Sequence, residues 1–272
     1  MAEFIMRGRV RAVLITLVGI PLISPAALAL VSLRRGSGDG LMVLAWALLP
    51  VVVMGFTGHM SPLMIGLTAS PLVAVCAGAL VLRSSRSWSA ALLALAAAGA
   101  GGILLTDHFS GGLLQTLLEA AEQAGGQVEQ MQQVFSSEPL ATGYLTWFSV
   151  MYAGLALALA RHWQALLYNP GGFREEFHQL RMPLPLAGVG MLVWVYCLVN
   201  PDYVFWGGVV AFPLVVAGIA LVHWLVASRN WGRGPLVAMY VALVIATLPL
   251  AGFLCGLALI DSWIDIRRRA AK

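Results

Sequence analysis

Residues 203–226 read "YVFWGGVVAFPLVVAGIALVHWLV", a run that contains no Asp, Glu, Lys or Arg. An α-helix rises ~1.5 Å per residue, so this run is long enough to cross the ~30 Å hydrocarbon layer of a membrane. Similarly apolar runs occupy 41–57, 61–82, 88–106 and 142–163, and a shorter one occupies 186–199. Because a helix satisfies its own backbone groups within lipid, the pattern predicts an all-α, polytopic transmembrane helix bundle.

The composition favours the same class of protein. The chain is 60% hydrophobic and 10% charged, with a mean hydropathy of +0.86, whereas soluble domains carry roughly 25% charged residues. The lipid bilayer is therefore the expected partner. The net charge of +4 comes from basic residues dispersed over short loops and both ends, which is typical of topology signals and not of nucleic-acid binding. The three cysteines lie far apart in apolar runs, and their spacing predicts neither a disulfide nor a metal site.

The basic residues indicate which loops face the cytoplasm. They fall in alternate loops, at 83–87, 161–185 and 227–234, while no Lys or Arg occurs between Arg86 and Arg161. The segment 107–141 in that interval carries acidic side chains instead. By the positive-inside rule, the three basic loops are cytoplasmic and 107–141 is extracytoplasmic. We expect a bacterial cytoplasmic (inner) membrane protein.

Two apolar runs near the ends of the chain, 12–33 and 235–263, have basic residues on both sides, including Arg7 and Lys272. The first contains Pro21 and Pro25, the second contains Pro249, and proline interrupts helices. If each run is a hairpin of two short helices, every basic residue is cytoplasmic and the chain has about eight membrane segments. If each run is a single span, several basic residues lie outside. We favour the hairpins, with the first run dividing into about 9–22 and 25–35.

The acidic segment contains "LLEAAEQAGGQVEQMQQVF" at 117–135. Its apolar residues follow gaps of three and four, which predicts an amphipathic helix whose polar face meets water. We expect an interruption at Gly125–Gly126, because glycine is unfavourable inside a helix. The apolar seam could rest on the bundle as a lid or pair with a second copy, and its alanines make it a weak dimerisation seam. The seam residues are Leu114, Leu117, Ala121, Ala124, Val128, Met131 and Phe135.

Three stretches resemble the YybS-like family of bacterial membrane proteins, whose function is unknown. They are "ALALVSLRRGSGDGLMVLAWALLP" (27–50), "YNPGGFREEFHQLRMP" (168–183) and "GLALIDSWIDIRRR" (256–269). That family is distantly similar to the substrate-binding subunits of energy-coupling-factor vitamin transporters. The resemblance implies a six-helix core over 1–163, including the insert 107–141, and an extension over 164–272. The extension is foreign to those subunits, and 9–22 lacks the Ala-x-x-x-Ala face with which they dock their coupling partner.

Candidate binding residues fall into two layers. In the outer layer, Asp107, His108, Asp202 and His59 could form a ligand site that opens outward. In the inner layer, "REEFHQLR" gathers Arg174, Glu175, Glu176, His178 and Arg181. The stripe Phe173, Phe177 and Leu180 predicts a short helix on the inner membrane face, where those charges would meet solvent, lipid phosphate or a partner. Glu175 and His178 have a spacing seen in di-metal bundles, but the further Glu-x-x-His that such a site needs is missing.

Ionisable residues also lie near the inner ends of the last two spans. His223 is close enough to its span's end to reach the interface. Asp261 and Asp265 are one turn apart and precede Arg267 and Arg268, which predicts an inner-face ion-pair cluster in preference to a proton relay.

No nucleophile, zinc or phosphate-binding motif is present in the sequence, so we expect neither an enzyme nor a cofactor. Two functions remain. The first is a transporter-like protein that binds a small molecule from the outer face. The second is a non-catalytic membrane scaffold or regulatory protein with a membrane-protein partner.

Overall fold

The computed structural model describes residues 1–6, 8–126 and 128–270. Within these ranges every regular element is helical, and six helices are long and apolar enough to cross a membrane. A seventh span results if the bent pair α10–α11 is taken as one. Arg7 and Lys272, two of the basic residues used to predict topology, lie outside the described residues.

The first apolar run forms two short helices, and Pro25 lies inside the second of them. After α1 (Ala2–Met6), the chain forms α2 (Arg9–Leu17) and α3 (Ile23–Arg35), with Pro21 between them. The hydroxyl of Ser24 at the start of α3 donates to the carbonyl of Ile15 in α2 at 2.8 Å, so the two short helices pack together. Helix α4 (Ser37–Phe56) follows and contacts α2, α3 and α5.

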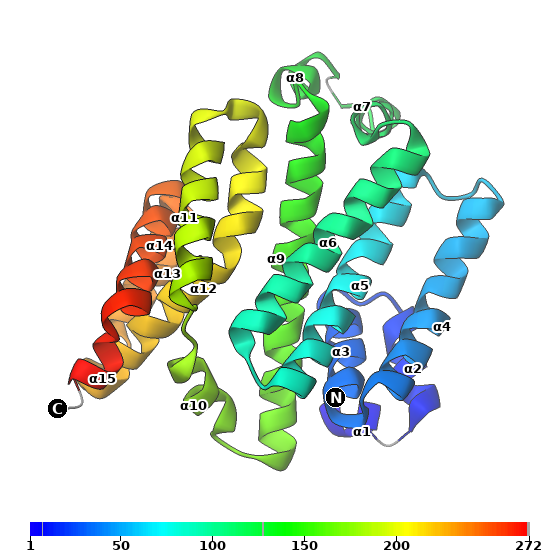
Figure 1. Ribbon diagram of the computed structural model, residues 1–272. Helices are drawn as coiled ribbons and strands as arrows, with labels where there is room; N and C mark the ends of the chain where they lie inside the picture. Colours follow the sequence, from blue (N-terminus) through cyan, green and yellow to red (C-terminus); the bar gives the residue numbers. More distant parts are fainter. Residues whose placement is uncertain (7, 127, 271–272) are drawn as a thin grey trace.

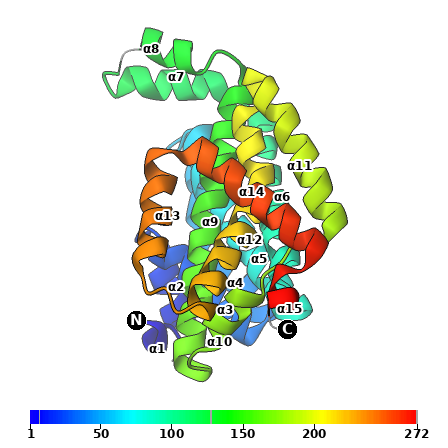
Figure 2. The same cartoon turned by 90° about the vertical axis from the view of Figure 1, so that its left-hand side faces the viewer.

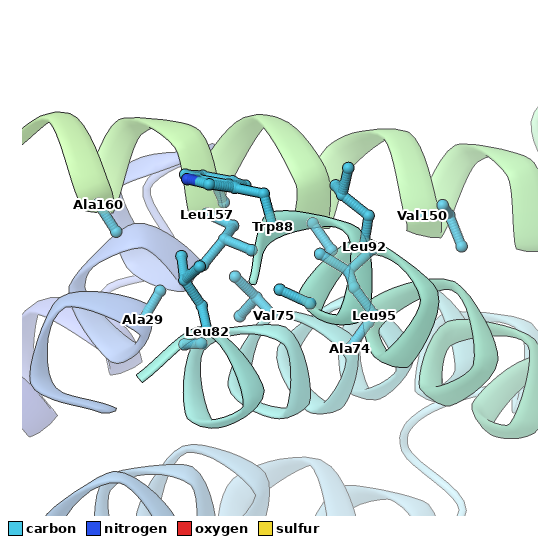
Figure 3. Packing of buried hydrophobic residues seen from close by; sticks show 14 of the residues in the cluster. Ala29, Ala74, Val75, Leu82, Trp88, Leu92, Leu95, Val150, Leu157 and Ala160 are labelled. Carbon is cyan, nitrogen blue, oxygen red and sulfur yellow. The ribbon is translucent and has the colours of Figure 1, made fainter. Parts of the chain in front are cut away.

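The centre of the bundle is built from α5 (Pro62–Ser85), α6 (Trp88–Ser110) and α9 (Glu138–Tyr168). Figure 3 shows how Val75, Leu95, Leu157 and their neighbours interlock between these helices. Small residues let the backbones approach, since a Cβ at Gly99 would lie 2.9 Å from the side chain of Val150. The carbonyl of Gly99 accepts a hydrogen bond from Ser70, whose hydroxyl also pairs with that of Ser149 at 2.7 Å.

The second half of the chain forms a group of helices that packs against α9 through α12 (Val204–Ser228). Helix α10 (Gly172–Gln179) is bent by 71° from α11 (Leu184–Val199). The 3₁₀ turn η1 (Pro201–Tyr203) leads into α12. The last helices are α13 (Gly234–Ile245), α14 (Thr247–Ile264) and α15 (Ile266–Ala270). The break in this run falls at Ala246, and Pro249 lies in the first turn of α14, where a proline costs no helical hydrogen bond. Figure 2 shows α13 and α14 running in opposite directions, so the start of α13 and the end of α14 lie on the same side of the molecule.

The polar insert forms two helices, α7 (Leu113–Gln123) and α8 (Val128–Val134), separated at the two glycines as expected. Gly125 has a φ of 71°, a left-handed conformation that glycine adopts without strain. Helix α7 rests on its own bundle, because Leu113 and Leu117 pack with Leu63, Ile103 and Leu145.

The two ends of the bundle differ in charge. Figure 1 shows α7 and α8 at one end, and α1, α10 and α15 at the other. At the second end Arg83 donates to the carbonyls of Leu33 and Arg34 at 2.7 Å. The guanidinium of Arg34 in turn lies over the Tyr168 ring. We refer to the end formed by α1, α10, α15 and the α5–α6 turn as the basic end, and to the end formed by α7 and α8 as the acidic end.

Candidate functional site

A large cavity lies toward the basic end, between the two halves of the chain. Its volume is about 560 Å³, within the range of pockets that hold small molecules. Helices α6, α9, α10, α12 and α13 all contribute to its wall, which is mostly apolar. The apolar part is lined by Leu92, Leu155, Ala158, Phe212, Val216 and Ile219, among others.

One wall of the cavity is a row of aromatic rings that crosses four helices. Trp88 of α6 packs against Phe173 of α10, which is followed by Phe177, His223 of α12 and Tyr240 of α13. Successive ring centroids lie 5.5–6.0 Å apart, a spacing at which aromatic pairs attract. The row ends in a hydrogen bond of 2.8 Å between His223 Nε2 and Tyr240 Oη.

Helix α10 is held against the bundle by Glu176. Its carboxylate accepts hydrogen bonds from Arg161 Nε at 2.9 Å and from Arg161 Nη2, both on α9. The indole of Trp88 donates to the same carboxylate at 3.4 Å. This anchor directs Phe173 and Phe177 into the cavity, so the apolar stripe of α10 faces the protein's own interior and not the membrane surface.

A second pocket of about 470 Å³ adjoins the first and has a different lining. The two share Arg174, His178 and His223. Asn230 and Arg233, from the loop between α12 and α13, line only the second pocket. An apolar cavity thus adjoins a polar pocket that carries two arginines and two histidines. We refer to this second pocket as the mouth.

His178 lies on α10, outside the six long helices that could each span a membrane. Burial lowers the pKa of its imidazole below the ordinary value of 6.5, and positive charge on Arg174, His223 and Arg267 lowers that pKa further. His178 is therefore mostly neutral at pH 7, and a negative charge beside it would favour its protonation.

The other predicted inner-face residues form a separate cluster beside α15. Arg181 donates to Asp265 at 3.0 Å and to the carbonyls of Asp261 and Ser262. Arg267 lies 3.7 Å from the Asp261 carboxylate and donates to the carbonyl of Leu180. The backbone N–H of Arg268 donates to Asp265. Glu175 is exposed on α10.

The predicted outer residues lie near the acidic end on three different segments. Asp107 and His108 end α6, where Asp107 accepts from the Leu113 N–H at the start of α7, at 2.8 Å. Asp202 accepts from the hydroxyl of Ser137 at 2.6 Å, and His59 pairs with Thr57 in the α4–α5 turn. Among the described contacts, none joins two of these four side chains. Asp107 caps the start of α7, and His59 takes part in the α4–α5 turn.

Across the described residues, no three His, Cys, Asp or Glu side chains gather where they could hold a metal ion. The histidines of the mouth stand among arginines, an arrangement that disfavours cations.

Among known proteins, no family model, curated protein or solved structure matches this chain.

Several residues of this site carry no signal in the sequence. Phe212, Val216 and Ile219 read as ordinary positions of an apolar span, and Tyr240 lies in a run whose course was ambiguous. The sequence singled out the Phe173–Phe177 stripe, Arg174, His178 and His223, and none of them indicates a cavity before α9 and α12 are brought together.

Proposed function

We propose that this chain is a multi-pass protein of the bacterial cytoplasmic membrane, with its basic end in the cytoplasm and its acidic end outside. The asymmetry of charge between the two ends supports this orientation. In this proposal the chain has about eight membrane segments, because α2–α3 and α13–α14 each enter and leave on the cytoplasmic side.

Cysteine accessibility in intact cells tests this topology. A cysteine at Ala270 should react only after the membrane is made permeable, and a cysteine at Glu122 should react from outside. Labelling of position 270 from outside would eliminate the α13–α14 hairpin and require one long tilted span.

We propose further that the protein is a non-catalytic, transporter-like protein that binds a small molecule in the cavity at its basic end. The observation that carries this proposal is the cavity itself, with its aromatic wall and polar mouth. The resemblance to transporter substrate-binding subunits agrees with it. The basic end is favoured over the outer face because the pocket near the end of α6 holds only about 290 Å³, and its lining includes none of the four outer candidates.

A ligand screen by thermal shift and native mass spectrometry tests this function. The purified protein should be stabilised by at least one class of small molecule. Ala158→Trp, which fills the cavity, should abolish that stabilisation, whereas Leu167→Trp, on the same helix but outside the cavity lining, should preserve it. Equal responses of both variants, or no ligand at all, would count against the proposal.

A scaffold is the second candidate. The observation that favours it is the exposed acidic face of α7, which includes Glu119 and Glu122 and projects beyond the bundle. Purification in mild detergent should then retain a membrane protein in fixed stoichiometry. Its loss in a Glu119→Lys, Glu122→Lys variant would identify this face as the docking site.

A further inference from the structure

The chemistry of the binding site changes from one end to the other. The deep part, between α6, α9 and α12, is lined mostly by apolar side chains, with His162 of α9 among them. The shallow part, at the loop after α12, is lined by Arg174, His178, Asn230 and Arg233. Because the two parts share residues, one molecule can occupy both.

The positive charge of the mouth is not neutralised within the protein. No Asp or Glu is among the residues that line either pocket. In the described part of the chain, neither Arg174 nor Arg233 makes an ion pair, while Arg161, Arg181 and Arg267 at the same end are paired with Glu176, Asp265 and Asp261. Arginine forms its strongest hydrogen bonds with carboxylate and phosphate groups. An anionic group on the ligand is the complement that this mouth lacks.

The deep part is open on one side. Helix α13 packs on α12 and α14 but not on α9. Along this gap Leu155 and Leu166 of α9 are 56% and 59% exposed, although both line the cavity. Figure 2 shows α13 standing apart on this side of the bundle. In a bilayer the opening faces acyl chains, so an apolar chain can enter sideways while its head group stays near the surface.

We propose, on the basis of the function proposed above, that the ligand is an anionic amphiphile with a phosphate or carboxylate head and an apolar chain. The head binds Arg174, Arg233 and His178. The chain lies along the aromatic row, between Ala158 and Phe212. The head of such a ligand pairs with the unpaired arginines. Its chain fills the apolar part of the cavity, where a polar group would lose its hydrogen bonds to water.

Binding to the full-length protein in nanodiscs of zwitterionic lipid tests this assignment. The probes are dodecyl phosphate, dodecanoate, dodecyl phosphocholine and inorganic phosphate, each below its micellar concentration and measured by thermal shift and calorimetry. Dodecyl phosphate or dodecanoate should bind at least about tenfold more tightly than either of the other two, because only they combine chain and net charge. A second arm adds phosphatidic acid to the nanodisc. If phosphatidic acid competes with the probe, a bilayer lipid is the source of the head group. If phosphatidic acid does not compete, the ligand is a free single-chain amphiphile.

Two variants locate the binding. Arg174→Gln with Arg233→Gln should weaken dodecyl phosphate by about tenfold or more and leave dodecyl phosphocholine unchanged. Arg229→Gln is the matched control, because Arg229 is an exposed arginine at the same end that lines neither pocket. Ala158→Trp should weaken every probe that has a chain.

The possible results separate the two proposals. If dodecyl phosphocholine binds as tightly as dodecyl phosphate and Ala158→Trp abolishes both, the cavity binds small molecules but the anionic head is wrong. If inorganic phosphate binds as tightly as the amphiphiles, the chain is wrong. If no probe binds the wild-type protein, or if Ala158→Trp changes the affinity of none of the probes, this inference is overturned. The proposed function is overturned as well only if the ligand screen also finds no ligand. The probe series on the wild-type protein decides the assignment even if a variant fails to fold.

Discussion

Proton binding and ligand binding should be coupled at His178. It faces Arg174 on its own helix, His223 on α12, Arg233 at the shared mouth and Arg267 on α15. Its pKa is below 6.5 in the free protein because of burial and these positive neighbours. A bound anion would place negative charge beside the imidazole and would therefore raise the pKa of His178.

The contribution of His178 to the affinity for an anionic amphiphile should therefore increase as the pH falls from about 8 to about 5.5, since its imidazole takes up a proton on binding. A phosphate head also titrates at about pH 6, so this contribution is the difference between the wild type and His178→Gln. Calorimetry of dodecyl phosphate binding in buffers of different ionisation enthalpy measures this uptake. His178→Gln should reduce the uptake and flatten the pH dependence. An unchanged profile in that variant would show that His178 does not face the ligand.

Glu176 and Glu175 are adjacent carboxylates with different surroundings. Glu176 bonds Arg161 and Trp88, whereas Glu175 is exposed. Glu176→Gln should lower the free energy of unfolding by on the order of 1–2 kcal/mol, a value that allows for the partial exposure of the pair. Glu175→Gln should change it by less than about 0.5 kcal/mol. Equal effects, measured by denaturant unfolding in mixed micelles, would mean that the Arg161 pair does not hold α10.

At the scale of the element, α9 and α12 approach closely at Gly154. A Cβ there would lie 2.3 Å from Cζ of Phe212, so even a methyl group must displace that ring from the cavity wall. Gly154→Ala should cost about 1–3 kcal/mol through this overpacking. Gly188→Ala on α11 is the control, because a Cβ there meets nothing within 4 Å, and it should be neutral or slightly stabilising. Equal thermal unfolding midpoints for Gly154→Ala and Gly188→Ala would contradict the close approach of α9 and α12.

Helices α7 and α8 give the second prediction at this scale. Leu114, Leu117, Met131 and Phe135, four residues of the predicted seam, pack onto Leu140, Ala141 and Tyr144 of the same chain. A cysteine at Val128 should therefore form little intermolecular disulfide under mild oxidation, and the buried native cysteines Cys76, Cys197 and Cys255 should not interfere. Efficient cross-linking would instead favour a coiled-coil dimer and eliminate the lid.

The sequence predicted elements better than it predicted their contacts. The uncharged runs correspond to α4, α5, α6, α9 and α12, because exclusion of charge from lipid is a local property. The glycine pair marked the end of α7 for an equally local reason. The stripe of Phe173 and Phe177, by contrast, is the same whether it faces lipid or a cavity. Arg181 was grouped with its neighbours on α10, although its partner Asp265 is 84 residues away. Such pairings depend on how α11 and α14 pack, which no local pattern encodes.

At the scale of the whole molecule, the two ends of the bundle differ in what they offer to a ligand. The acidic end carries a helical cover and side chains engaged in caps and turns. The basic end carries the cavity, the aromatic row and the unpaired arginines. The outer candidate site that the sequence suggested and the cavity of the structure lie at opposite ends, so one labelling experiment can separate them.

Photo-cross-linking with a dodecyl phosphate analogue that carries a diazirine in its chain, followed by peptide mapping, tests this claim most directly. We predict labels on α9 and α12 around Ala158, Val216 and Ile219, which Ala158→Trp removes and Leu167→Trp preserves. Labels concentrated around His59, Asp107 and Asp202, unaffected by Ala158→Trp, would place the site at the outer mouth and contradict the account.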